Sequence, residues 1–244
     1  MIAQLAMYDR PETAAATDRF WAAIRGHLGE GPERLDRDTP LWEAWQSPDL
    51  LLAQTCGLPF RSRLHPRVTL VATPDHGLPG CPPGHYTSVF VAHRTRADAA
   101  LADFAGARFA YNEALSHSGW AAPRTHMDAA GLRMGTLVPT GAHRASARAV
   151  AEGRADLAGL DALTWEMIRR HDDFAADLVE IARTDPTPAL PYITARNRDP
   201  EPLRTALSAA VDTLSPADRD TLHLRAIVTI PASTYLAVPT PPAP

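Results

Sequence analysis

Residues 109–120 read FAYNEALSHSGW, which indicates a strand, a short polar loop and the start of a helix. The first turn of a helix has unpaired N–H groups and a partial positive charge. Ser116 and Ser118 add two hydroxyl donors, and Gly119 lets an anion approach the backbone because it has no Cβ. The stretch therefore predicts a site for a tetrahedral oxyanion such as phosphate or phosphonate. An ordinary serine-capped structural helix is the alternative interpretation.

Two further stretches have a similar design. Residues 138–146, VPTGAHRAS, follow an expected strand and open a helix, so that Thr140 and His143 point polar atoms towards the same ligand or simply lie on a capped helix. Residues 153–161, GRADLAGLD, run from a turn into a strand that ends at Asp161. Asp161 either orients His143 or caps the next helix.

Strands and helices alternate around these loops, which argues for a parallel sheet covered by helices. The strands are expected at 108–111, 134–138, 155–160 and 178–182, and the helices at 97–105, 116–130, 143–153 and 162–171.

The first and last parts of the chain predict a second α/β unit. Its strands are expected at 2–7, 50–54, 67–73, 86–93 and 192–195, and its helices at 12–28, 201–213 and from Ser215 onwards, before a disordered tail at 239–244. With one crossing near His93 and a return through the proline-rich residues 186–191, we expect two lobes. The first is discontinuous and the ligand cleft lies between them. The expected division is 1–92 and 189–244 for lobe 1, and 93–188 for lobe 2.

Composition excludes several classes of function. The 244 residues carry a net charge of -4, and all 24 basic side chains are arginine. Without a lysine amine the chain has no Schiff-base chemistry, no pyridoxal-lysine site and no Walker A loop. The mildly acidic balance argues against general nucleic-acid binding. Cys56 and Cys81 belong to no CxxC pair, so we expect no zinc site, and two buried thiols are favoured over a disulfide.

The N-terminal residues MIAQLAMYDR lack the basic start and the longer apolar run of a secretory signal. As the sequence stands, the expected location is the cytoplasm. Removal of a signal peptide would make the protein periplasmic.

The order of these motifs resembles that of a known family. Residues 7–9, 54–57, 86–88, 116–119, 140–146 and 153–161 resemble segments of the phosphate, phosphite and phosphonate substrate-binding proteins of ABC transporters, within the type 2 periplasmic-binding-protein superfamily. The resemblance implies an α/β fold with two Rossmann-like lobes that close on a small anion. It also implies an ABC permease as partner, with no cofactor, no metal and no catalytic residue.

The resemblance also assigns the ligand contacts. Ser116, His117, Ser118 and His143 would hold the oxyanion, Tyr8, Gln54 and Tyr86 would face it from the first lobe, and Asp161 would line the second. Residues 188–192 offer no acidic side chain for a ligand amine, so an aminophosphonate is not expected.

Two other functions remain open on the same fold. One is a cytoplasmic enzyme similar to the menaquinone-pathway enzymes that act on small carboxylates, with His143 or Asp161 as its base. The other is a ligand sensor, which would need a partner because no DNA-binding helix-turn-helix is visible in the sequence.

Overall fold

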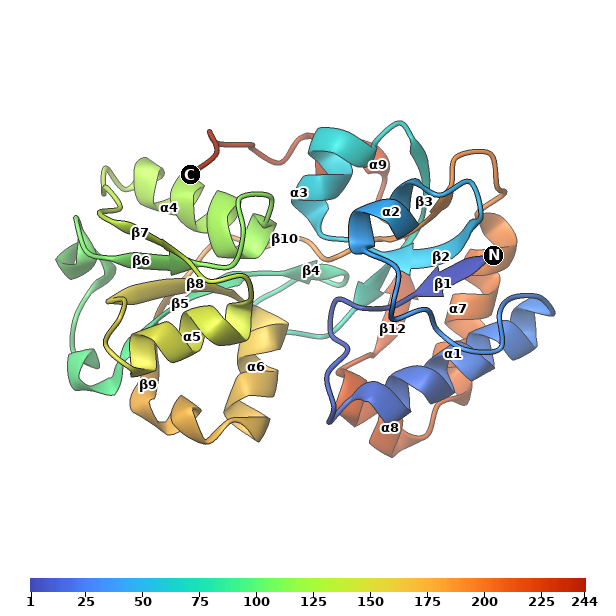
Figure 1. The fold of residues 1–244 in the computed structure, drawn as a ribbon, viewed down its shortest axis with the longest axis horizontal. Coiled ribbons are helices and arrows are strands. Elements are labelled where there is room, and N and C mark those ends of the chain that lie inside the picture. Colours follow the sequence, from blue (N-terminus) through green and yellow to red (C-terminus); the bar gives the residue numbers. More distant parts are fainter. The chain divides into compact units, whose positions relative to one another are not determined.

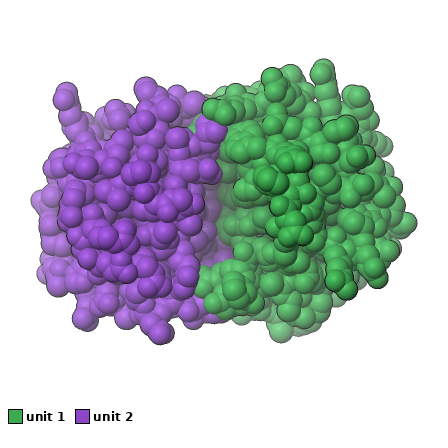
Figure 2. Space-filling view, in the orientation of Figure 1, with its two compact units in different colours: residues 1–85, 188–237 green, residues 86–187, 238–244 purple.

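The computed structural model describes residues 1–244 and divides them into two compact units. Unit 1 comprises residues 1–85 and 188–237, and unit 2 comprises residues 86–187 and 238–244 (Figure 2). The division differs from the expected one near His93 because the strand that ends there belongs entirely to unit 2. The C-terminal residues also belong to unit 2, whereas the sequence placed them in lobe 1.

The sheet of unit 1 has the strand order β1-β2-β11-β3-β12. Strand β1 (Ile2–Gln4) runs parallel to β2 (Leu50–Gln54), and β11 (Tyr192–Ala195) lies antiparallel between β2 and β3 (Val68–Asp75). Strand β12 (Ala226–Val228) pairs antiparallel with β3. All five residues of β2 are buried, which explains why its sequence is an uninterrupted apolar run.

Helices cover both faces of this sheet (Figure 1). On one face Phe20 and Ile24 pack into a core with Leu207, and on the other Trp45 and Tyr235 share a second core. The first face carries α1 (Ala14–Leu28), α7 (Glu201–Thr213) and α8 (Pro216–Leu222), and the second carries α2 (Leu41–Gln46), α3 (Gly57–Pro59), the π-helix η1 (Phe60–Leu64) and α9 (Ala232–Leu236).

The sheet of unit 2 has the order β7-β6-β8-β5-β9. Strand β6 (Phe109–Tyr111) runs parallel to both β7 (Leu137–Pro139) and β8 (Leu157–Asp161). Strand β5 (Ser88–His93) runs antiparallel to β8 and to β9 (Leu178–Arg183). The four strands that the sequence expected in a parallel sheet do share one direction, and the sheet is mixed because β5, which the sequence assigned to the first lobe, lies antiparallel between β8 and β9. Only the strands joined by covering helices run parallel, and β5 enters directly from the crossing in the opposite direction.

The helices of unit 2 also lie on both faces of its sheet (Figure 1). The π-helix η4 (His117–Ala121) continues into α4 (Ala122–Ala129) on one face, and α5 (His143–Ala151) and α6 (Ala162–His171) lie on the other. The helix expected at 97–105 is wrong, because with Phe104 as its only buried side chain the segment has no apolar face. Short 3₁₀ turns occur instead: η2 (Arg94–Arg96), η3 (Leu101–Phe104) and, further on, η5 (Asp173–Asp177).

The chain passes between the units along the short strands β4 (His85–Tyr86) and β10 (Thr187–Pro188), which pair with each other. The C-terminal tail, expected to be disordered, contacts unit 2, where the indole Nε1 of Trp120 donates to the backbone oxygen of Pro242 at 3.0 Å. Cys56 and Cys81 are half-buried, and no disulfide joins them. None of the helices is both long and apolar enough to cross a membrane.

Candidate functional site

The strand directions of unit 2 bring several predicted residues to one edge of its sheet. Strands β6, β7 and β8 all run one way, so the loops that follow them share this edge. Strand β5 begins at the same edge because Ser88 pairs in register with Asp161, the last residue of β8. We call this region the unit 2 edge, formed by Thr87, Ser88, Asn112, Ser116–Gly119, His143 and Asp161.

Ser116 and its neighbours form the start of η4. The Oγ atom of Ser116 accepts a hydrogen bond from the backbone N–H of Gly119 at 3.0 Å, so the serine caps the helix as its alternative interpretation required. Its hydroxyl hydrogen is not used in that bond and remains a donor. Ser116, His117 and Ser118 are almost completely buried, with exposed fractions of 2 to 3%.

Ser118 and His143 meet across the unit 2 edge, as the sequence anticipated when it placed both on one ligand. The Ser118 Oγ and His143 Nε2 atoms lie 3.0 Å apart. Burial lowers the pKa of His143 to about 4, against a smaller opposing effect of the Gly159 backbone, so the ring is neutral at neutral pH. When Nε2 carries a hydrogen, Ser118 accepts it and can turn its own hydroxyl hydrogen towards an anion.

Two glycines allow η4 to approach the sheet closely. A Cβ at Gly119 would overlap Oδ1 of Asn112 and lie 3.2 Å from Cε1 of His143. A Cβ at Gly159 would lie 2.6 Å from Cγ of Pro123 and 3.1 Å from the backbone oxygen of Gly119. Glycine at both positions therefore maintains the geometry of the unit 2 edge.

His117 and Tyr86 form a second contact in unit 2. The His117 Nε2 and Thr187 Oγ1 atoms lie 2.9 Å apart, and the ring of Tyr86 lies 6.0 Å from that of His117. The sequence placed Tyr86 in the first lobe, but the residue belongs to unit 2 because the division of the chain falls directly before it. Asp161 accepts a hydrogen bond from the Thr164 N–H at 2.9 Å, which is its capping role on α6.

Besides Nδ1 of His143, three buried polar side chains at the unit 2 edge lack a hydrogen-bond partner at one atom each. They are the hydroxyl oxygens of Thr87 and Ser88 and the Oδ1 atom of Asn112. A buried polar atom without a partner costs about 1–3 kcal/mol, which is typical of a site that a ligand or water completes. Sequence reasoning missed all three, although each directly follows or opens an expected strand, a position where ligand contacts gather in α/β folds.

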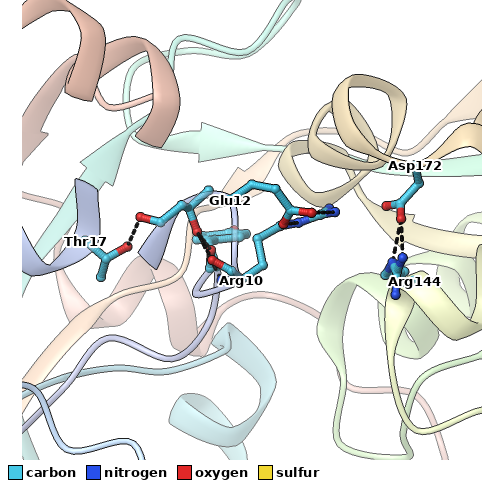
Figure 3. A network of polar contacts seen from close by, with 7 residues as sticks. Arg10, Glu12, Thr17, Arg144 and Asp172 are labelled. Carbon is cyan, nitrogen blue, oxygen red and sulfur yellow. Dashed lines mark hydrogen bonds and ion pairs between the residues drawn. The ribbon is translucent and has the colours of Figure 1, made fainter. Parts of the chain in front are cut away.

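The donors of the unit 2 edge are neutral. Arg144, which follows His143 in the chain, donates from Nε to Oδ1 of Asp172 at 2.6 Å (Figure 3). Its guanidinium is therefore held in an ion pair with a carboxylate whose side chain is 1% exposed. Hydroxyl groups, a ring nitrogen and backbone N–H groups at a helix start remain to hold an anion. No cluster of His, Cys, Asp or Glu side chains suited to a metal ion occurs in the chain.

Unit 1 has a corresponding edge. Tyr8 follows β1, Gln54 ends β2 and His76 follows β3, while the antiparallel β11 begins at Tyr192, in register with Gln54. These four side chains line one cavity of about 40 Å³, and we call them the unit 1 edge. Tyr8 and Gln54 were predicted, whereas His76 and Tyr192 were missed. The available signal for both was their position at strand ends.

Contacts within unit 1 hold these side chains in place. Gln54 donates from Nε2 to the backbone oxygen of Leu190 at 3.1 Å, and the rings of Tyr8 and His76 meet edge to face with their centres 5.5 Å apart. Burial lowers the pKa of His76 to about 4 and raises that of Tyr192. Both side chains are therefore uncharged at neutral pH.

Comparison with solved structures identifies proteins of the same fold. PhnD1 of Prochlorococcus marinus, in complex with methylphosphonate, matches with a TM-score of 0.72 and 17% identity over 96% of this chain and 94% of that chain. A binding-protein component of an ABC phosphonate transporter from Pseudomonas aeruginosa matches with a TM-score of 0.65 and 14% identity over 93% and 80%. A histidine kinase sensor domain similar to periplasmic binding proteins matches with a TM-score of 0.61 and 17% identity over 99% and 98%.

Sequence comparison is more specific. No curated protein sequence matches the chain. The family model described as ABC transporter, phosphonate, periplasmic substrate-binding protein matches residues 49–232, which is more than half of the chain. This match and the solved structures confirm the α/β type 2 periplasmic-binding-protein fold that the motifs predicted. The chain belongs to the family of periplasmic phosphonate substrate-binding proteins of ABC transporters.

Proposed function

We propose that the protein captures a small oxyanion of the phosphate, phosphite or phosphonate type through the unit 2 edge, and delivers it to an ABC permease. The contact between Ser118 and His143 at the start of η4 carries the proposal. It combines a hydroxyl donor, a ring nitrogen and a helix start in a buried region. The family match supports the permease and the periplasm as the partner and the location.

Binding without chemistry is the function that the geometry supports best. A serine next to a histidine is also the arrangement of a nucleophile and its base, but such pairs rely on a third group that orients the histidine. Here the backbone of Gly159 raises the pKa of His143 slightly, against the larger effect of burial. One carboxylate oxygen of Asp161 accepts the hydrogen bond that caps α6. The contact between Ser118 and His143 alone does not distinguish the two functions, whereas the buried neutral donors favour oxyanion capture.

The Ser118→Ala variant tests this proposal. Each hydrogen bond to a charged group contributes about 1.5–3 kcal/mol, so its affinity for the oxyanion should fall roughly ten- to a hundredfold. Titration calorimetry with methylphosphonate, phosphite and phosphate measures the change. The melting temperature of the ligand-free protein should fall by only a few degrees, because Nε2 of His143 loses its partner while the helix cap Ser116 is retained.

Ser208→Ala provides the matched control, since Ser208 lies within α7 of unit 1. It should change neither affinity nor melting temperature by a measurable amount. If none of the three oxyanions binds the wild-type protein, or if Ser118→Ala binds as tightly as wild type, the proposed site is wrong.

A further inference from the structure

We propose that an arginine-lined groove in unit 1 binds a diphosphate group, either as the free ion or as part of a small organic molecule. The groove lies at the edge of the unit 1 sheet opposite the unit 1 edge. It belongs entirely to unit 1, so the inference stands independently of the oxyanion site proposed in unit 2.

The strand directions of unit 1 place three separate segments around this groove. Strands β2 and β3 run in the same direction because both pair antiparallel with β11, and β11 ends where β3 begins, with Ala195 opposite Val68. Residues 45–48 precede β2, Arg67 precedes β3, and residues 195–198 end β11 and follow it. Together these three segments line one open pocket of about 510 Å³, which we call the arginine groove.

The arginine groove carries positive charge that no carboxylate balances. Arg67 and Arg196 are exposed, and neither guanidinium forms an ion pair. Arg67 only approaches a neutral amide, with its Nη1 atom 3.5 Å from Oε1 of Gln46. The third arginine, Arg198, is paired, because its Nη1 atom lies 2.6 Å from Oε1 of Glu30. No Asp or Glu lines the groove, so two positive charges remain available to a ligand.

The lack of carboxylate partners is informative, whereas the residue type is not. All 24 basic side chains of the chain are arginine, so arginine in a groove follows from composition alone. Elsewhere in unit 1, the exposed side chains of Arg19 and Arg37 each contact an aspartate at 2.6 Å. Asp49 and Asp199 adjoin the arginine groove in the chain, but neither of them lines it. The groove is therefore a place where the usual pairing is absent.

The donors of the arginine groove suit phosphoryl groups. Guanidinium N–H groups match phosphate oxygens in paired hydrogen bonds, and Ser47 and Asn197 add a hydroxyl and an amide. The oxygens of a phosphoryl group point to several sides, whereas those of a carboxylate lie in one plane. Donors that come from three segments therefore favour the phosphoryl group.

The size of the groove and the number of free guanidinium groups favour two linked phosphoryl groups over one. The volume of about 510 Å³ lies within the range of ligand pockets, roughly 300–1,000 Å³, and is much larger than a single phosphoryl group. A diphosphate can contact the guanidinium groups of both Arg67 and Arg196. The competing explanation is a docking surface for an acidic segment of another protein.

Titration calorimetry of the full-length chain with inorganic diphosphate tests the site. Arg67→Gln and Arg196→Gln each remove one guanidinium, so each should weaken binding about tenfold or more. Both side chains are exposed, so the melting temperature should change by less than about 2 °C. Arg133→Gln is the matched control, because Arg133 is an exposed arginine of unit 2 without an ion pair, and it should bind diphosphate as wild type does.

Glu30→Gln should have the opposite effect. It leaves Arg198 without its carboxylate and adds one positive charge to the arginine groove. Diphosphate affinity should therefore rise about two- to fivefold. This gain should disappear in 1 M NaCl, where charges are screened beyond about 3 Å. A groove that has only a structural role would show no such gain.

Two further measurements separate the arginine groove from the oxyanion site proposed in unit 2. Ser118→Ala should leave diphosphate binding to the groove unchanged, and an excess of methylphosphonate should not displace the diphosphate. Uridine diphosphate then identifies the source of the group. Binding as tight as that of inorganic diphosphate indicates an organic diphosphate, whereas weaker binding indicates the free ion.

The outcomes distinguish this inference from the proposed function. If Ser118→Ala abolishes diphosphate binding while Arg67→Gln and Arg196→Gln retain it, the inference is overturned and oxyanion capture in unit 2 stands. If diphosphate binds through the two arginines and methylphosphonate, phosphite and phosphate do not bind, the inference stands and the proposed function is wrong. The inference is also overturned if wild type binds no diphosphate, including the case in which a tetrapeptide of alternating Asp and Glu binds through the two arginines instead.

Discussion

The two units present the same strand arrangement with different kinds of side chain at its edge. In each unit, polar residues gather where parallel strands end and an antiparallel strand begins. The unit 2 edge is dominated by hydroxyls and a helix start, with Ser116 and Ser118 buried beside His143. At the unit 1 edge, the aromatic rings of Tyr8 and Tyr192 surround His76 and Gln54.

Each edge contains one buried histidine, and the difference lies in the partner of its Nε2 atom. In unit 2 this nitrogen meets the hydroxyl of Ser118 at 3.0 Å, whereas in unit 1 the Nε2 of His76 has no partner. In the first arrangement, when Nε2 carries the hydrogen, the Ser118 hydroxyl is a donor that can turn towards an anion. In the second arrangement the buried ring nitrogen has no donor beside it. The comparison therefore teaches that the same strand arrangement can give a buried histidine a hydroxyl partner in one unit and leave it without a partner in the other.

Replacing Gly119 should cause the largest loss at the unit 2 edge. In Gly119→Ala the new methyl group overlaps Oδ1 of Asn112 and crowds His143. We expect oxyanion affinity to fall by at least about a hundredfold, and the free energy of unfolding to fall by about 1–3 kcal/mol from overpacking. Calorimetric titration and chemical denaturation measure the two effects.

Gly26→Ala is the control for this substitution. Gly26 lies within α1, and an added Cβ there meets no atom within 4 Å. It should leave affinity unchanged and raise stability by about 0.5–1 kcal/mol, because alanine favours a helix interior. Wild-type affinity in Gly119→Ala would show that the close approach of η4 has no role in binding.

Much of this architecture was predictable from local sequence, and the exceptions have physical causes. The run at residues 50–54 and the helix at residues 201–213 have the predicted bounds because both are strongly apolar or periodic. The direction of β5 was not predictable, because it depends on the entry of the chain from unit 1 rather than on any residue in the strand. The same applies to the C-terminal tail, whose contact with Trp120 is a long-range hydrogen bond.

For the site, the sequence identified residues by type but not by partner. The pairing of Ser118 with His143 follows from two loops that both looked suited to an anion. His76 lies in a loop rich in glycine and proline, where nothing local distinguishes a buried histidine from an exposed one. Its burial arises from β3 and from the αL residue His223, which lies far away in the sequence.

The pH dependence of stability tests whether both histidines are buried and neutral. Burial lowers the pKa of His76 and of His143 from 6.5 to about 4. The folded protein therefore binds fewer protons than the unfolded chain between these values. Their contribution to stability is complete above pH 6.5 and is lost as the pH falls towards 4. Between pH 7.5 and 5 the free energy of unfolding should fall by about 2 kcal/mol for each histidine.

Urea denaturation of variants at the two pH values assigns this loss to each unit. His76→Gln in unit 1 and His143→Gln in unit 2 should each reduce the loss of unfolding free energy between pH 7.5 and 5 by about 2 kcal/mol. The exposed His27 serves as control, and His27→Gln should leave the fall unchanged. A variant that retains the complete fall would show that its histidine is hydrated, and the similarity between the two edges would then be lost.

The smallest expected effects concern one ion pair in each unit (Figure 3). In unit 2 the Asp172 side chain is 1% exposed and lies 2.5 Å from Nη2 of Arg144, while in unit 1 the Glu12 side chain is 37% exposed and lies 2.7 Å from Nε of Arg10. Asp172→Asn should lower the free energy of unfolding by about 1–2 kcal/mol, because a buried partner is lost, whereas Glu12→Gln should cost less than about 1 kcal/mol. Chemical denaturation at neutral pH compares the two.

Because the donors of the unit 2 edge are neutral, Asp172→Asn should change oxyanion affinity by less than about threefold even though it releases the Arg144 guanidinium next to His143. A much larger gain in affinity, lost again at high salt, would show that charge rather than neutral hydrogen bonding controls capture in unit 2.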